Sequence, residues 1–151
     1  MNAAAPNAVA TSGTALAFDF GERRMGVAVG DLSLRISHPL LTVEADSDAG
    51  RLEAVAALIR EWQPVILVVG LPAHLDGTEH ALSARCRKFA RRLTARFGLS
   101  TELVDERLTS YAAAEALAQA GVRGRRQKQM VDQVAAQQIL DTFFQLHHDA
   151  A

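Results

Sequence analysis

Apolar and polar residues alternate along this chain in two different periods, which predict strands and helices. Near the start, segments 16–20, 25–31 and 36–44 have the apolar pattern and the length of strands. The turn at 21–24 separates the first two segments and predicts a hairpin. Pro39 interrupts the third segment, and because proline cannot donate a ladder hydrogen bond, we expect an edge strand there.

Beyond residue 45 the pattern switches between helical and strand periods. Residues 65–69 are all apolar, which favours a central strand covered on both faces. Other expected elements are helices between 46–48 and 63–64, at 80–97, from 109 or 110 to about 120 and at 127–146, and a strand at 101–105. Three meandering strands followed by alternating helices and strands predict an α/β fold with one mixed sheet flanked by helices.

The length of 151 residues suits one domain. We expect that domain at 14–146, with a flexible leader at 1–13 and a tail at 147–151. No apolar stretch approaches the length of a membrane span, and the leader lacks the features of a secretory signal. We therefore expect a cytoplasmic protein with no membrane partner. The single cysteine, Cys86, excludes an internal disulfide and is predicted to lie in the core.

Three carboxylates occupy positions that a core would normally give to apolar residues. Asp19 interrupts the first strand pattern, and Glu106 follows the strand at 101–105. Asp132 falls within the apolar stripe of the last helix, which is formed by Val131, Ala135, Ile139, Phe143 and Leu146. A charge on a packing face is costly unless it is paired or binds a metal. If the three groups converge, they would suit a hard cation such as Mg²⁺, which serves phosphate-ester chemistry.

Each of these carboxylates also has a plain structural interpretation. Asp19 could pair with Arg23 or Arg24 on the strand surface, and Asp132 could lie near the helix N-terminus, where the macrodipole favours an acid. The charged run 105–107 could act as a cap or an ion pair. These alternatives stay open at the level of the sequence.

Basic residues are concentrated in the second half of the chain. Residues 1–79 carry 5 Lys+Arg and 10 Asp+Glu, whereas residues 80–151 carry 11 and 7. Arg85, Lys88, Arg92 and Arg96 fall on one face of the helix at 80–97, and a basic loop at 121–126 leads into Lys128; its arginines are Arg123, Arg125 and Arg126. A solvated surface is one interpretation, and contact with nucleic-acid phosphates is the other.

Several segments together resemble one known family. They are DFGERRMGVAVGD (19–31), VVGLP (68–72), DGTE (76–79), ARCRKFARRL (84–93), DERLTS (105–110) and the spaced residues from Lys128 to Leu140. In this order they are similar to the YqgF/RuvX family, a bacterial branch of the RNase H-like nuclease superfamily.

The resemblance implies a five-stranded mixed sheet, with three antiparallel strands and then parallel strands, flanked by helices on both faces. It also implies that Asp19, Glu106 and Asp132 form a catalytic triad that binds Mg²⁺ or Mn²⁺ in a two-metal type of mechanism. Glu106 is preferred over Asp105 because of the family's DER pattern. The substrate-binding residues we expect are Arg23, Arg24, Arg107, Arg85, Lys88, Arg92, Arg123, Arg125, Arg126 and Lys128.

Family members are described as nucleases that mature the 5′ end of pre-16S rRNA, which makes ribosome biogenesis the leading hypothesis. The first alternative is resolution of Holliday junctions in DNA, and the second is a non-catalytic RNA-binding protein. Structured RNA is therefore the favoured partner and branched DNA the other, bound by a monomer or a homodimer.

Overall fold

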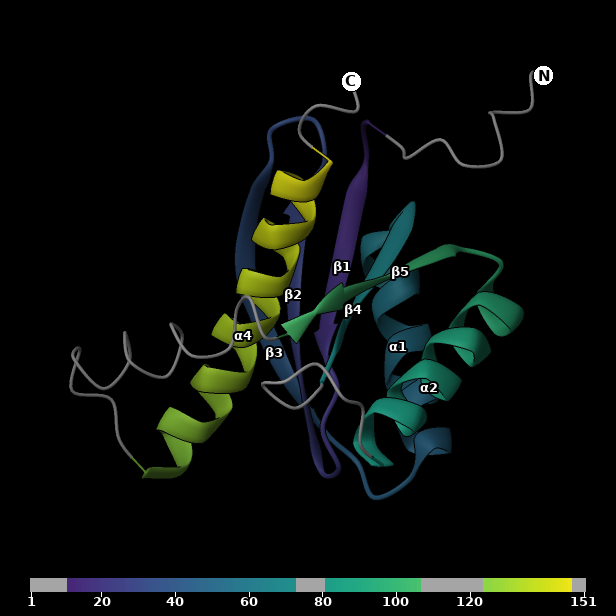
Figure 1. Cartoon of the computed structure of the whole chain (residues 1–151), viewed down its shortest axis with the longest axis vertical. Coiled ribbons are helices and arrows are strands. Elements are labelled where there is room, and N and C mark those ends of the chain that lie inside the picture. The colour runs from purple at the N-terminus through teal and green to yellow at the C-terminus, as the bar shows by residue number, and fades with distance from the viewer. Residues whose placement is uncertain (1–10, 73–80, 107–123, 148–151) are drawn as a thin grey trace.

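The computed structural model describes residues 11–72, 81–106 and 124–147, with only the backbone described at 124–128 (Figure 1). Its sheet has five strands in the order β3-β2-β1-β4-β5. The strands are β1 (Thr14–Asp19), β2 (Arg24–Asp31), β3 (Ile36–Glu44), β4 (Ile66–Leu71) and β5 (Ser100–Asp105). The first three are antiparallel, whereas β4 runs parallel to both β1 and β5. The predicted mixed sheet and hairpin are confirmed.

Strand β3 lies at the edge of the sheet, as Pro39 predicts. Pro39 pairs opposite Ala28, and the register of the two strands shifts between Val27 and Ala28. A shift of this kind lets a residue without an N–H group sit in the ladder without leaving a partner unsatisfied in the middle of the sheet.

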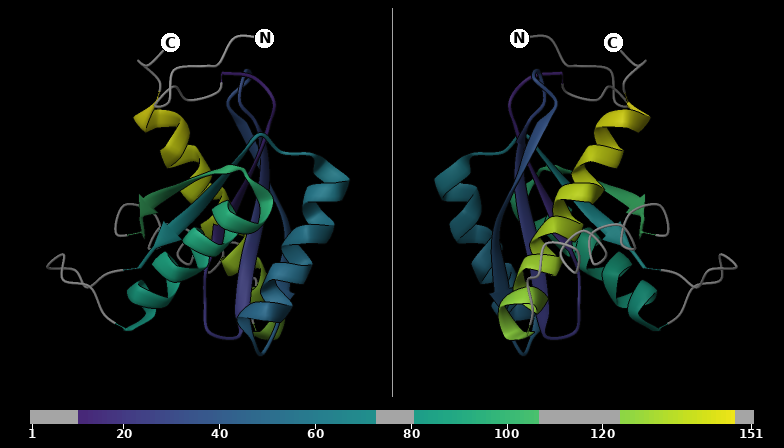
Figure 2. Two further views of the ribbon diagram at one scale, coloured as in Figure 1. Left: turned by 90° about the vertical axis from the view of Figure 1, so that its right-hand side faces the viewer. Right: turned by 90° about the vertical axis from the view of Figure 1, so that its left-hand side faces the viewer.

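Helices cover both faces of the sheet (Figures 1 and 2). α1 (Asp48–Trp62) and α2 (Ala81–Phe97) lie on one face, and α4 (Gly124–Leu146) crosses the other. The Ser47 side chain accepts a hydrogen bond from the Gly50 N–H at 3.1 Å and so caps α1. In the part of the chain that the structure describes, no helix has the length and apolar character needed to cross a membrane.

The alternation of side chains along β1 divides the core into two layers. Leu16 and Phe18 pack in the layer that includes α1 and α2. Ala15 and Ala17 pack in the other layer, beside residues of α4 such as Ile139. Because successive side chains of a strand point to opposite faces, the next residue on the α4 side is Asp19.

Two details of α4 differ from the sequence prediction. The helix begins at Gly124 rather than at residue 127, so part of the basic segment expected as a loop is helical. Arginine, glutamine and lysine are good helix formers, which explains the earlier start. Leu146 is 63% exposed because it ends the helix beyond the last buried aromatic residues.

Other predictions fall on segments that the structure leaves undescribed. They are the helix from 109 or 110 to 120, the DGTE motif at 76–79, and most of the leader and tail. The single domain expected at 14–146 stays a prediction.

Candidate active site

The centre of the site is the end of β1, where Asp19 lies between two glycines. Asp19 pairs opposite Gly26 on β2 and opposite Gly70 on β4. A Cβ atom at Gly26 would lie 1.9 Å from the main-chain oxygen of Asp132, and one at Gly70 would lie 3.2 Å from Cγ of Glu106. The two glycines therefore leave the space in which α4 and Glu106 approach Asp19.

Asp19 and Glu106 meet directly, although they are far apart in the sequence. Their carboxyl groups lie close enough to share a hydrogen bond, which would require a proton on one of them. Burial raises the pKa of Asp19 well above its usual range, and this hydrogen bond and the charges of Glu106 and Asp132 raise it further. The fold thus gathers negative charge at one point.

Glu106, rather than its neighbour Asp105, reaches the site. Glu106 follows the last residue of β5, and a Cβ atom placed at Gly70 of β4 would meet both Ile139 of α4 and Cγ of Glu106. The Glu106 side chain therefore lies on the side of the sheet that α4 covers.

Asp132, the third carboxylate, forms an ion pair with Arg24. Arg24 Nε donates to Asp132 Oδ2 at 2.7 Å, and the two side chains are 39% and 17% exposed. The small residues Ala135 and Ala136 are buried on the same helix, which allows α4 to lie close to the sheet. Asp132 is near enough to Asp19 for its charge to raise the pKa of Asp19.

The carboxylates of Asp19, Glu106 and Asp132 are chemically suited to a divalent cation. Among the described residues, however, no group of three His, Cys, Asp or Glu side chains is arranged so that it could hold a metal ion as it stands. The cluster nevertheless offers only carboxylate oxygens, the ligands that Mg²⁺ and Mn²⁺ prefer. The guanidinium of Arg24 offsets the charge of Asp132, and the raised pKa of Asp19 favours a proton on that carboxyl group. A bound cation would supply the same compensation.

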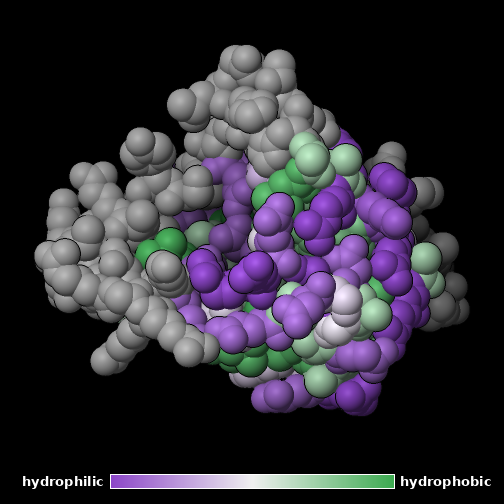
Figure 3. Space-filling view, turned by 90° about the horizontal axis from the view of Figure 1, so that it is seen from below, coloured by the Kyte–Doolittle hydropathy of each residue, from purple (hydrophilic) through white to green (hydrophobic). Residues whose placement is uncertain are grey.

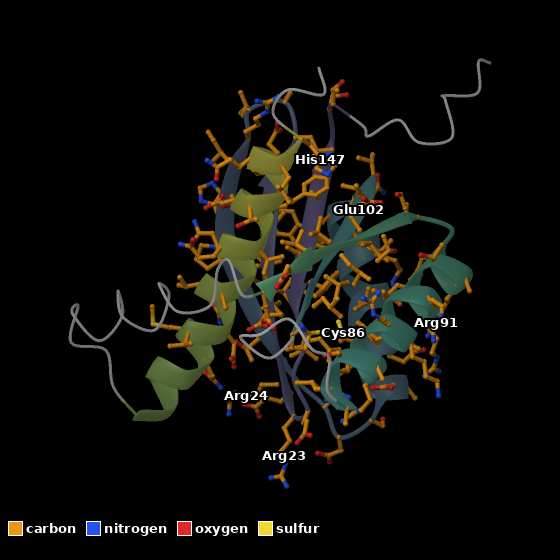
Figure 4. All side chains as sticks on the ribbon, viewed as in Figure 1. Arg23, Arg24, Cys86, Arg91, Glu102 and His147 are labelled. Atoms are coloured by element: carbon orange, nitrogen blue, oxygen red, sulfur yellow. The ribbon has the colours of Figure 1, made fainter. Side chains whose placement is uncertain are left out.

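The predicted substrate-binding residues differ in their exposure and in their partners. Arg23 is exposed in the turn before β2, and it lies with Arg24 at the lower end of the molecule in Figure 4. Arg85 Nη2 lies 3.7 Å from Asp48 Oδ1, and its guanidinium lies 5.7 Å from the centre of the Phe20 ring. The surface around this end, seen in Figure 3, is largely hydrophilic where the structure describes it.

Further along α2, Lys88 and Arg92 are exposed and have no partner among the described residues. Arg96 instead pairs with Glu53 at 2.6 Å. Arg107 and Arg123 lie outside the described residues, as do the side chains of Arg125, Arg126 and Lys128.

Sequence reasoning missed one buried residue that shapes the site, Arg51 of α1. It donates to Asp48 at 3.0 Å and to the carbonyl oxygens of Gly21 and Glu22, the first of these at 2.8 Å. Its guanidinium also lies 5.1 Å from the centre of the Phe20 ring. Arg51 thereby fastens the turn that joins the ends of β1 and β2. The available signal was an Asp–Arg pair at i,i+3 beside the apolar residues of α1.

Comparisons with known proteins agree with this architecture. A protein from Nitrosospira multiformis named "Putative pre-16S rRNA nuclease" is 59% identical over 133 residues, which cover 88% of each chain. A protein of the same name from Nitrosomonas europaea is 53% identical over 142 residues, covering 94% of this chain and 96% of the relative.

Among solved structures, the fold resembles RuvC of T. thermophilus in complex with a Holliday junction substrate. The TM-score is 0.57 at 16% identity, and the match covers 92% of this chain and 98% of that one. A second structure of Thermus thermophilus RuvC gives a TM-score of 0.50 at 12% identity, with 89% and 96% coverage. These likenesses concern the RNase H-like fold.

Residues 13–146 match the family model described as "RuvX: Holliday junction resolvase". This match spans every strand and helix that the structure describes, and the relatives from Nitrosospira and Nitrosomonas extend over nearly the same length. The chain therefore belongs to the RuvX family of nucleases.

Proposed function

We propose that this chain is a metal-dependent phosphodiesterase that matures the 5′ end of pre-16S rRNA in the cytoplasm. The observation that carries the proposal is the convergence of Asp19, Glu106 and Asp132 at one end of the sheet. The choice of pre-16S rRNA as substrate follows the names of the relatives from Nitrosospira and Nitrosomonas.

In this proposal the three carboxylates hold Mg²⁺ or Mn²⁺, two ions in the complete site. Such ions activate a water molecule and stabilise the charge that develops on the phosphate oxygens. Asp19 occupies the central position because it interacts with both of the other acids. Arg51 keeps the end of β1 in place, and the glycines at 26 and 70 let α4 and Glu106 lie close to Asp19.

Basic side chains on two sides of the acidic centre would hold the nucleic-acid backbone. Arg23 lies in the turn before β2, Arg24 begins β2 and pairs with Asp132, and Arg107 follows Glu106 in the chain. Arg85, Lys88 and Arg92 extend the basic surface along α2. Arginine and lysine contribute affinity without reading sequence, so recognition of the RNA end would depend on its shape.

The experiment compares cleavage of a pre-16S rRNA fragment by wild type, Asp19→Asn, Glu106→Gln and Asp132→Asn in Mg²⁺ or Mn²⁺. We expect each substitution to reduce the rate by at least about a hundredfold, since each removes a charged ligand of the ions. Asp105→Asn is the matched control for Glu106→Gln and should retain activity. Equal cleavage by wild type and Asp19→Asn would refute the proposal.

A second candidate, resolution of Holliday junctions, is favoured by the description of the matched family model. A symmetric cut across a four-way junction needs two active sites, so this function requires a dimer. Light scattering and a choice between junction and pre-16S substrates separate the two candidates. Salt-sensitive RNA binding without turnover at any metal concentration would instead indicate a non-catalytic RNA-binding protein.

A further inference from the structure

The ion pair between Arg24 and Asp132 affects how a metal ion would bind at the acidic centre. The pair joins the first residue of β2 to the first half of α4, and its Nε–Oδ2 distance is 2.7 Å. A charge-assisted bond this short is stronger than a neutral hydrogen bond. Asp132 therefore already has a cationic partner before any metal arrives.

A metal ion and this guanidinium compete for the same carboxylate. Asp132 lies close enough to Asp19 to act on its charge state, so a cation held by both acids would come near Arg24. Two positive groups that share one carboxylate repel each other, and Oδ2 of Asp132 already accepts a hydrogen bond from Arg24 Nε. Binding of the ion therefore favours release of Arg24.

Arg24 has space to move when it is released. Its side chain is 39% exposed, and its two Nη groups have no partner among the described residues. It borders an open hollow of about 450 Å³ that is lined by Arg23, Arg24, Glu44, Ala45 and Asp46. Because the carboxylates of Glu44 and Asp46 on the same lining would repel a phosphate, the phosphate would lie on the arginine side of the hollow, where the planar fork of Arg24 can bind it through two nitrogens.

We propose that Arg24 is an exchange residue: it holds Asp132 in the metal-free protein and moves to a phosphate of the nucleic acid when a divalent cation takes Asp132. The inference rests on the proposed function, because it takes Asp132 as a metal ligand. It makes metal and nucleic acid bind cooperatively, since each removes the partner that hinders the other.

The first measurement is Mn²⁺ affinity by titration calorimetry, without nucleic acid. Arg24→Ala should bind Mn²⁺ about five- to tenfold more tightly than wild type, because a competitor is removed. Arg23→Ala is the matched control: it changes the net charge equally but removes an exposed arginine with no role in the pair. Arg24→Lys should stay near wild type because it keeps the competing charge.

The second measurement is binding of a phosphorothioate-linked, cleavage-resistant RNA oligonucleotide, followed by fluorescence anisotropy in Mn²⁺ and in EDTA. Mn²⁺ should strengthen binding by wild type several-fold, and should strengthen binding by Arg24→Ala less, because that variant keeps the contribution of the ions and loses that of the released arginine. Arg24→Lys should show a reduced gain, since an ammonium group cannot form the bidentate contact. Thermal unfolding of each variant establishes that the fold is intact.

The two levels of the inference fail in different ways. If Arg24→Ala binds Mn²⁺ no more tightly than Arg23→Ala, the exchange is wrong while metal-dependent cleavage can still stand. If wild type and all variants fail to bind Mn²⁺, the proposed function is wrong, and the exchange of Arg24 between Asp132 and a phosphate is wrong as well.

Discussion

At the scale of single residues, the site depends on the contrast between Asp19 and its glycine neighbours. A carboxyl group at the end of β1 is placed beside two other acids because Gly26 and Gly70 have no side chains to keep them away. Burial in the first place, and the neighbouring acids after it, raise the pKa of Asp19, which shows the cost of placing a carboxylate there. A cost of this kind is common where a fold is arranged for binding or catalysis.

Asp19→Asn should stabilise the metal-free protein at neutral pH. Because the pKa of Asp19 is raised in the folded state, the folded protein binds more protons, and wild type loses stability as the pH rises from the unfolded value of 3.8 through the folded pKa. The advantage of asparagine should be greatest above the folded pKa and should vanish below the unfolded one. Each kcal/mol gained raises Tm by about 2–4 °C.

Thermal unfolding in EDTA across this pH range measures the effect of Asp19→Asn. Asp46→Asn, which changes an exposed carboxylate before α1, is the control. A gain for Asp19→Asn that is the same at every pH would contradict the explanation, because it would not follow the proton on Asp19.

Gly26→Ala should displace α4 and impair the site. The new methyl group would lie 1.9 Å from the Asp132 main-chain oxygen, and backbone cannot yield as a flexible side chain can. We expect a loss of about 1–3 kcal/mol in denaturant unfolding, together with reduced cleavage. Gly50→Ala, in the first turn of α1, is the control: its added Cβ meets Ala45 and Ser47, which precede the helix, at 3.4 Å, and it should be neutral or stabilising by up to about 1 kcal/mol.

At the scale of elements, helix α1 does more than cover the sheet. Arg51 projects from its buried face and is bonded to the turn between β1 and β2. That turn lies between Asp19 and Arg24, two residues on which the site depends. A helix on one face of the sheet thus stabilises the arrangement of a site on the other.

Arg51→Met should lower the free energy of unfolding by about 2 kcal/mol. The substitution preserves much of the apolar contact with Phe20, but it leaves the carbonyl oxygens of Gly21 and Glu22 without their donor. Arg60→Met, at an exposed position of the same helix, should change stability by less than about 0.5 kcal/mol. Urea unfolding of the two variants provides the test. Equal changes in the free energy of unfolding would argue against a stabilising role for the hydrogen bonds of Arg51 to the turn.

At the scale of the whole molecule, the sheet separates an acidic centre on the α4 side from a basic helix on the other face (Figure 2). A nucleic acid that contacts both the acidic centre and α2 must pass around the end of β1 and β4. Under the proposed function, the charge on α2 would contact a part of the substrate away from the scissile bond.

The exposed residues of α2 should contribute to salt-dependent binding. Lys88→Ala and Arg92→Ala should each lower the slope of log affinity against log salt by about 0.7–0.9, because each removes one phosphate contact. Arg96→Ala should have a smaller effect, since Arg96 is held by Glu53. Anisotropy titrations over a range of salt concentrations measure these slopes; a full-sized effect of Arg96→Ala would exclude this assignment of roles.

Sequence pattern alone determined the strands, two of the three described helices, the edge position of β3 and the burial of Cys86, because these depend on local periodicity, turn residues and the chemistry of proline. It also pointed to Asp19, Glu106 and Asp132. Only the tertiary structure decided that Glu106 rather than Asp105 meets Asp19, that Arg24 pairs with Asp132 and that Arg51 is buried. These facts depend on which residues from distant segments come together, and a one-dimensional pattern contains no distances between them.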